Sequence, residues 1–358
     1  MSTPAPSSAP ASTALRFSGE RVLRLGGLSL RVHRRSFWVG IACLIVALAA
    51  AAYSLTIGDS AISLGEVWGA LTGQADAGTS RIVLDWRLPR VLMALCGGAA
   101  LAMSGAVFQT LTGNPLGSPD IIGFNTGAYT GALLSMLVVG GGSTGTTVGA
   151  LIGGTATGAL VYLLALRHGL HGYRLIVIGI GVSAMLGAIN SYLMITVKLE
   201  AAISAQVWGA GSLNTIRWVD LTPTILVTLI CLPLLLVLWR QAGMLGLGVE
   251  TASGRGVNIG FLRVALLGLG VVLTAAVTAV AGPIAFVALV APQIALRLTR
   301  GAGIPLLPTA FLGAALLVIS DLVARTLLAP VQLPVGVVTV VLGGGYLVWM
   351  LISRLRKA

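Results

Sequence analysis

The chain has 358 residues, of which 9% are charged and 56% are hydrophobic. A soluble globular domain usually carries about 25% charged residues, so 10 acidic and 22 basic side chains are too few to cover the water-facing surface of a soluble enzyme of this length. The net charge of +12 is not concentrated in one domain, which argues against a nucleic-acid-binding protein, and the composition predicts an all-α polytopic membrane protein.

Residues 1–35 are predicted to form a cytoplasmic tail before the first apolar segment. Met1–Thr13 is rich in Pro, Ala and Ser, a composition typical of disorder. Arg16–Arg35 is basic with interspersed Leu and Val, and we interpret it as a segment that sets the topology. The alternative is that it lies on the anionic inner leaflet of the membrane.

Residues 36–358 are predicted to form one transmembrane domain of ten helices, because an apolar helix needs about 20 residues to cross a bilayer. Two of the apolar stretches are long enough to hold two spans each, separated at Gly140–Thr147 and at Gly282-Pro283. The stretches without acidic or basic residues are Ser36–Gly58, Val91–Pro119, Ile121–Leu166, Leu175–Val197, Leu221–Trp239, Val264–Leu296, Gly301–Ser320 and Thr326–Ser353.

The distribution of basic residues favours ten spans over nine. A single kinked span over Val264–Leu296 would place the basic C-terminus outside the cell, against the tendency of basic residues to stay in the cytoplasm. Ten spans instead place both termini and most basic residues in the cytoplasm, and most acidic residues outside.

Several enzyme and carrier classes require motifs that the sequence lacks. A P-loop needs a lysine after glycine, but Lys198 and Lys357 follow Val and Arg, so ATP hydrolysis would require a separate polypeptide. The histidines lie in predicted cytoplasmic segments and the cysteines have no paired spacing, so no catalytic residue, metal site or cofactor is predicted. Asp321, with Arg325 one helical turn later, is the main ionisable candidate inside the membrane, which leaves an ion-coupled secondary carrier as a weaker alternative.

A series of motifs occurs in order along the chain. It includes Arg87-Leu-Pro-Arg90, Asn114-Pro-Leu-Gly-Ser-Pro-Asp120, Gly282-Pro-Ile-Ala-Phe286, Asp321-Leu-Val-Ala-Arg325 and Gln332-Leu-Pro-Val-Gly-Val-Val-Thr339. From Ser36 onward the chain thereby resembles the FecCD-type permeases, which serve ABC importers of iron siderophores and vitamin B12. The stretches most similar to the ferric enterobactin permeases, in particular the second subunit, are Asp85–Ala94, Gly117–Gly127 and Trp208–Asn214.

The resemblance implies a type II ABC importer permease, similar in fold to the vitamin B12 permease, in the bacterial cytoplasmic membrane. The implied partners are a second permease subunit (identical or different), two cytoplasmic ATPase subunits and an extracytoplasmic substrate-binding protein. The implied substrate is a ferric siderophore of the catecholate type. The alternative within the same family is a haem or vitamin B12 permease. An alternative from another functional class is a structural membrane scaffold.

In the family, arginines on the outer face receive carboxylates of the binding protein, and the matching residues here are Arg87, Arg90 and Arg325. Arg87 and Arg90 are three residues apart, so they share one face at the outer end of the second span. A guanidinium group has a planar fork that suits a carboxylate. The alternative is that these arginines set the topology or pair locally, as Asp321 would with Arg325.

Residues 244–260 form the longest predicted cytoplasmic connection. The resemblance implies that they form short coupling helices seated in a cleft of the ATPase, and the alternative is an ordinary solvated linker. The residues expected at this contact are Leu247, Glu250, Ser253, Arg255 and Val257.

Helix breaks and small residues are expected along the translocation path, because irregular backbone is tolerated in a membrane where it faces a cavity or protein. Glycine also permits close helix packing, which is the alternative explanation for the small residues. The residues predicted for the path and its helix breaks are Asn114, Pro115, Gly127, Gly282, Pro283 and Pro292.

Overall fold

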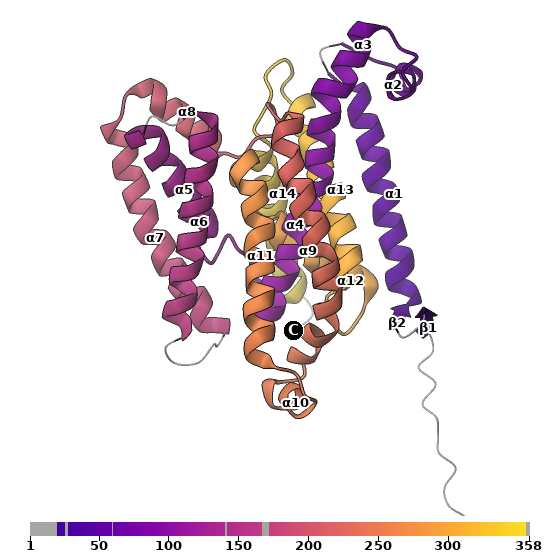
Figure 1. Cartoon of the computed structure of the whole chain (residues 1–358), viewed down its shortest axis with the longest axis vertical. Helices are drawn as coiled ribbons and strands as arrows, with labels where there is room; N and C mark the ends of the chain where they lie inside the picture. The colour runs from indigo at the N-terminus through magenta and orange to yellow at the C-terminus, as the bar shows by residue number, and fades with distance from the viewer. Residues whose placement is uncertain (1–19, 26–27, 59, 140–141, 167–171, 356–358) are drawn as a thin grey trace, which may run out of the picture.

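Long apolar helices make up most of the structure, a computed structural model that describes residues 20–25, 28–58, 60–139, 142–166 and 172–355 (Figure 1). Within these residues, seven helical segments are long and apolar enough to cross a membrane. They are α1 (Arg34–Thr56), the continuous segment of α3 (Ala77–Arg81), η1 (Ile82–Arg87) and α4 (Leu88–Thr112), then α6 (Ser143–Leu166), α7 (Gly172–Thr196), α9 (Trp218–Leu245), α11 (Ile259–Ala281) and α13 (Leu306–Thr326).

Three further apolar elements lie where the remaining spans were predicted. They are α5 (Phe124–Leu134) with its continuation η2 (Ser135–Val139), α12 (Val287–Thr299) and α14 (Val335–Leu355). Both predicted divisions of long apolar stretches are confirmed, because η2 ends before α6 begins and α11 ends before α12 begins. The polytopic helical fold is therefore confirmed, while the number of ten crossings stays a prediction.

Helix α4 runs through the centre of the bundle and contacts α9, α11, α12 and α13 (Figure 1). Glycine permits two of these contacts at backbone distance. A Cβ on Gly98 would lie 2.4 Å from the Gly313 carbonyl oxygen of α13, and a Cβ on Gly105 would lie 1.7 Å from the Ala288 carbonyl oxygen of α12. Small residues at helix contacts let backbones approach in this way.

Helices α5, α6, α7 and α8 (Leu199–Gly209) form a group beside α11, drawn at the left of Figure 1. Within it, α5 and α6 pack backbone to backbone through glycines. A Cβ on Gly131 would lie 2.0 Å from the Gly149 carbonyl oxygen, and a Cβ on Gly153 would lie 2.3 Å from the Gly127 carbonyl oxygen.

The two ends of the bundle carry different short elements. Helices α2 (Leu64–Leu71) and α3 lie at one end, called the α2 end below, and α10 (Val249–Gly254) lies at the other, called the α10 end (Figure 1). Helix α2 begins with a capping box, in which the Glu66 carboxylate accepts from the Ser63 amide at 2.7 Å and Ser63 Oγ accepts from the Glu66 amide at 3.3 Å. The backbone and hydroxyl donors of Ser63 lower the pKa of Glu66.

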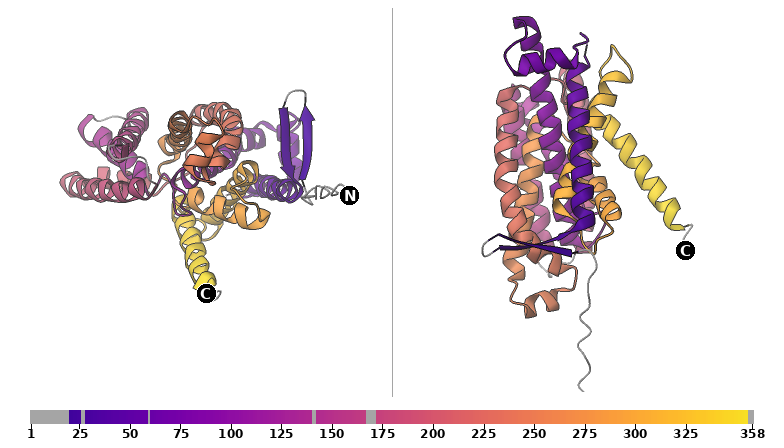
Figure 2. Two further views of the ribbon diagram at one scale, coloured as in Figure 1. Left: turned by 90° about the horizontal axis from the view of Figure 1, so that it is seen from below. Right: turned by 90° about the vertical axis from the view of Figure 1, so that its right-hand side faces the viewer.

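Helix α14 leans away from the other helices (Figure 2). Cation–π contacts connect it to α12. The Arg297 guanidinium lies 5.6 Å from the ring centre of Tyr346 and 5.4 Å from that of Trp349. Strand β1 (Glu20–Leu25) and the last described turn of α14 both lie toward the α10 end (Figure 2).

The predicted cytoplasmic tail over residues 1–35 stays a prediction, but its second half contains regular structure. Glu20–Leu25 and Leu28–His33 form an antiparallel hairpin, β1 and β2, directly before α1. The signal was present, because Leu28–His33 alternates apolar and polar residues and two glycines separate the strands, a pattern typical of a hairpin. Neither interpretation of Arg16–Arg35 is tested by this hairpin, and Met1–Thr13 lies outside the described residues.

Candidate functional site

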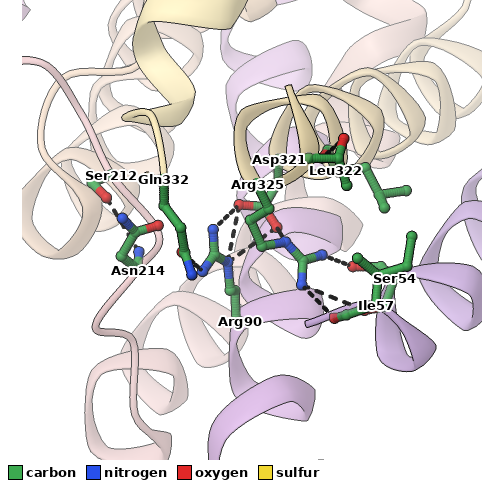
Figure 3. A network of polar contacts seen from close by, with 10 residues as sticks. Ser54, Ile57, Arg90, Ser212, Asn214, Asp321, Leu322, Arg325 and Gln332 are labelled. Atoms are coloured by element: carbon green, nitrogen blue, oxygen red, sulfur yellow. Dashed lines mark hydrogen bonds and ion pairs between the residues drawn. The ribbon is translucent and has the colours of Figure 1, made fainter. Parts of the chain in front are cut away.

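A buried ionic cluster lies at the α2 end, where α1, α4 and α13 meet (Figure 3). Arg90 belongs to the first turn of α4, where Pro89 is favourable because its missing amide proton is not needed. Arg90 Nε lies 3.0 Å from Asp321 Oδ1 and 3.1 Å from Oδ2, and Nη2 lies 2.8 Å from Oδ1. Arg90 Nη1 also donates to Gln332 Oε1 at 3.0 Å, which ties the segment before α14 to the cluster.

Arg325 approaches the same carboxylate from the other side (Figure 3). Its Nε lies 3.2 Å from Asp321 Oδ2, an ion-pair contact without hydrogen-bond geometry. Its terminal nitrogens donate to the Ser54 hydroxyl, and to the Ser54 and Ile57 carbonyl oxygens at 3.4 Å. A cation is favoured at these carbonyl oxygens because they lie at the C-terminal end of α1. In the cluster as a whole, one carboxylate and two guanidinium groups join three helices.

Arg87, the last residue of η1, secures the chain after α1. It donates to the Leu55 carbonyl oxygen at 2.8 Å and to the Ser60 carbonyl oxygen at 2.6 Å. The structure thus gathers Arg87, Arg90 and Arg325 at one end of the bundle, as predicted, but leaves them only 8–9% exposed, and Asp321 1% exposed. This low exposure differs from the expectation that the arginines lie on the outer face of the protein. Docking of these arginines to a partner's carboxylates stays a prediction.

The contact of Arg325 with Asp321 agrees with the local-pairing alternative, but the sequence did not predict the pairing of Arg90 with Asp321 or the participation of Ser54 and Gln332. The pair of Arg90 with Asp321 joins residues 231 positions apart, and Ser54 and Gln332 contribute from two further segments. The usable signal was a single acidic residue in an apolar helix, because such a residue almost always finds a partner inside the protein.

The predicted coupling segment projects from the α10 end as the short helix α10 (Figure 1). Gly248 and Gly256 flank this helix with φ values of 103° and 82°, a left-handed region that glycine adopts without strain. Val257 is half-buried and packs against the main core. The exposed members of the predicted contact are Leu247, Glu250, Ser253 and Arg255.

Asn114-Pro115 and Gly282-Pro283 lie between helices, and their place on the translocation path stays a prediction. The first follows the end of α4, where the Asn114 side chain accepts a hydrogen bond at 2.9 Å from the amide two residues later. The second separates α11 from α12, where Gly282 has a φ of 71° and a Cβ would lie 2.3 Å from the Trp208 carbonyl oxygen. Only glycine meets both requirements at this position.

Gly127 and Pro292 lie inside helices, so the predicted break at Pro292 is wrong. Helix α12 continues through Pro292 and loses one intrahelical hydrogen bond, the one to the Ala288 carbonyl oxygen. That carbonyl faces Gly105 of α4 at close range. Gly127 lies at the α5–α6 contact, where a Cβ would be 2.7 Å from the Gly153 carbonyl oxygen, in agreement with the packing alternative.

A buried amide pair connects α4 to α12 and was not predicted. Gln293 Nε2 donates to Gln109 Oε1 at 2.7 Å, and Gln109 Nε2 donates to the Leu289 carbonyl oxygen at 2.9 Å.

Among the described residues, no three His, Cys, Asp or Glu side chains lie close enough to hold a metal ion. The predicted cytoplasmic pair His168 and His171 lies outside the described ranges.

Comparison with known proteins agrees with this fold. FepG of Escherichia coli (strain K12), a ferric enterobactin transport system permease protein, is 47% identical over 320 residues, covering 88% of this chain and 97% of FepG. CbrC of Dickeya dadantii (strain 3937), an achromobactin transport system permease protein, is 37% identical over 336 residues, covering 93% of this chain and 96% of CbrC.

A solved structure, described as an inward-facing conformation of a metal-chelate type ABC transporter, superposes with a TM-score of 0.79 at 30% identity. The match covers 88% of this chain and 99% of that chain, which confirms the expected type II ABC importer fold. Residues 44–353 match the FecCD transport family. The chain is a multi-pass transport permease, and it belongs to the FecCD transport family.

Proposed function

We propose that this chain is the permease subunit of an ATP-driven importer that carries a ferric siderophore across the bacterial cytoplasmic membrane. The observation that carries the proposal is the 47% identity with FepG over 88% of the chain. Because FepG is a ferric enterobactin permease, we expect a chelate of the catecholate class. The chain would bind and pass the chelate, and separate ATPase subunits would hydrolyse ATP.

The proposed assembly contains a second permease subunit (identical or different), two cytoplasmic ATPase subunits and an extracytoplasmic substrate-binding protein. We place the α10 end in the cytoplasm, which makes both termini cytoplasmic. The basic residues near the end of α9, directly after α10 and at the start of α11 support this orientation; they are Arg240, Arg255 and Arg263.

The α2 end is the proposed docking surface for the binding protein, with Arg87, Arg90 and Arg325 beneath it. Arg90 and Arg325 share the single carboxylate of Asp321, so this pair of guanidinium groups leaves a positive potential that attracts acidic groups. Arg217 is 74% exposed at the same end, 3.5 Å from the Asp220 carboxylate, and lies at the surface, where rim charges steer docking.

Uptake of radio-iron-labelled ferric enterobactin by the complete transporter in proteoliposomes tests the function. We expect accumulation that requires ATP, the ATPase subunits and the binding protein. Uptake driven by an ion gradient without the ATPase would contradict the proposal and favour the ion-coupled carrier. Faster uptake of haem or vitamin B12 than of any ferric siderophore would favour the alternative within the family.

Substituting Leu247→Glu is expected to abolish co-purification of the ATPase without loss of folded permease. Leu247 is 61% exposed beside α10, so a charge there costs little in the free chain but would be buried unpaired in an ATPase cleft. Leu64→Glu is the matched control, because Leu64 is 63% exposed at the α2 end. Normal ATPase recovery with Leu247→Glu would contradict the coupling role of this segment.

A further inference from the structure

A cavity of about 590 Å³ lies between α5, α7, α8 and the link from α11 to α12. This volume falls in the range of about 300–1,000 Å³ typical of small-molecule sites. Its described lining includes several polar side chains but no acidic or basic one. The residues that matter below are Asn125, Tyr129, Asn190, Ser191, Gln206 and Pro283.

Asn190 lines this cavity and carries an unsatisfied acceptor. The residue is only 5% exposed, and its Oδ1 atom has no hydrogen-bond partner among the described residues. Leaving a buried acceptor unpaired costs about 1–3 kcal/mol, so a native structure rarely keeps one without a function. A ligand that donates an N–H or O–H group would satisfy it.

Asn125 is held in one orientation on the opposite wall. Its Nδ2 donates to Asp120 Oδ1 at 2.5 Å, and its Oδ1 accepts from Thr278 Oγ1 at 3.5 Å. Asp120 is fixed in turn, because its Oδ2 accepts from the Phe286 amide at 3.3 Å. Supporting contacts of this kind preorganise a binding group, and Asp120 acts here as a positioning residue.

Tyr129 supplies a rigid aromatic wall. Its ring stacks on Trp208 with centroids 6.3 Å apart and an interplanar angle of 8°. A Cβ on Gly209 would lie 2.6 Å from the Tyr129 ring, so the backbone of α8 packs directly against the ring. An aromatic group of a ligand gains from such a surface.

We propose that this cavity is a transit site for the chelate, in which an aromatic amide arm lies along Tyr129 and donates a hydrogen bond to Asn190. The proposal rests on the proposed function. The uncharged lining explains how a charged chelate is held briefly, because hydrogen bonds and ring contacts orient it without a fixed opposite charge that would retain it. The opening lies at Ser191 and Gln206, both of which are exposed.

Substituting Asn190→Leu or Asn125→Leu in the complete transporter is expected to lower the maximal rate of ferric enterobactin uptake about tenfold, the effect of about one buried hydrogen bond. Thr196→Val on α7 is the control, because Thr196 is exposed and outside the cavity lining. Uptake at the normal rate by both asparagine variants would overturn the proposal.

A labelling experiment decides the same question without disturbing the buried residues. The thiol introduced by Gln206→Cys is expected to react with a thiol reagent and to be protected by ferric enterobactin, but not by a ferric trihydroxamate, which lacks aromatic arms. The thiol of Ser204→Cys, exposed on the same helix and outside the lining, is expected to react equally with and without either chelate. The native cysteines Cys43, Cys96 and Cys231 do not line the cavity.

The outcomes distinguish failure of the transit site from failure of the proposed function. Normal uptake by the asparagine variants, with no protection of the Gln206→Cys thiol, would contradict the transit site alone, and equal protection by both chelates would contradict the role of the aromatic arm. ATP-independent uptake by the unmodified transporter would contradict the proposed function, and protection in the Gln206→Cys variant would then still decide whether the cavity binds the chelate.

Discussion

Substituting Asp321→Ala is expected to lower the free energy of unfolding by about 3–5 kcal/mol, the usual cost of removing one partner from a buried ion pair. The change would leave the guanidinium groups of Arg90 and Arg325 buried without a carboxylate, since both contact Asp321 and neither is more than 9% exposed. Denaturant titration of the purified chain in mixed micelles measures the loss directly.

Two comparisons show whether the loss comes from the unpaired charges. Asp220→Ala removes a partly exposed partner of Arg217 at 3.5 Å and the hydrogen bond from the Arg217 amide that caps α9, and is expected to cost about 1 kcal/mol. Combining Asp321→Leu with Arg90→Met and Arg325→Met replaces the whole cluster by apolar side chains and is expected to recover most of the stability. An Asp321→Ala chain as stable as the unmodified one would contradict the structural role of the cluster.

Substituting Gly105→Ala is expected to destabilise the chain by about 3 kcal/mol, at the upper end of the range for overpacking. The new Cβ would lie 1.7 Å from the Ala288 carbonyl oxygen, and both partners belong to helix backbones, so no side chain can rotate away. Helices α4 and α12 would have to separate, which would also strain the amide pair of Gln109 and Gln293. The same denaturant titration measures the effect.

Gly268→Ala on α11 is the matched control, because nothing lies within 4 Å of a Cβ at that position. It is expected to leave stability unchanged or raise it by up to about 1 kcal/mol, the difference in helix propensity between glycine and alanine. Equal stability of the Gly105→Ala and Gly268→Ala chains would show that α4 and α12 do not meet as described.

Much of the fold could be predicted because hydropathy fixes the position of membrane helices. The division at Gly282-Pro283 was predictable from two residues that cannot continue a helix. The continuation of α12 through Pro292 was not, because a proline within an apolar run predicts a break and the tertiary packing that decides otherwise cannot be read from the local sequence. The hairpin before α1 was missed for a different reason, since its alternating pattern is short and lies within a basic segment.

The candidate site was only partly predictable. Arg87, Arg90 and Arg325 could be placed at one end of the bundle, but their burial follows from contacts with α1 and with Gln332, which no local pattern reveals. The exposed turn around Leu247 and Glu250 was predictable because it lies in a long polar–apolar connection. The Asn190 cavity required the three-dimensional arrangement, since its lining comes from segments spread over much of the chain.

The placement of β1 and the last turn of α14 toward the same end of the bundle has a topological consequence. A backbone that starts and finishes on one side of a lipid barrier must pass through it an even number of times, whichever way the protein is inserted. This parity depends only on where the described chain starts and finishes. It is therefore independent of the hydropathy and charge counts from which the number of crossings was first inferred.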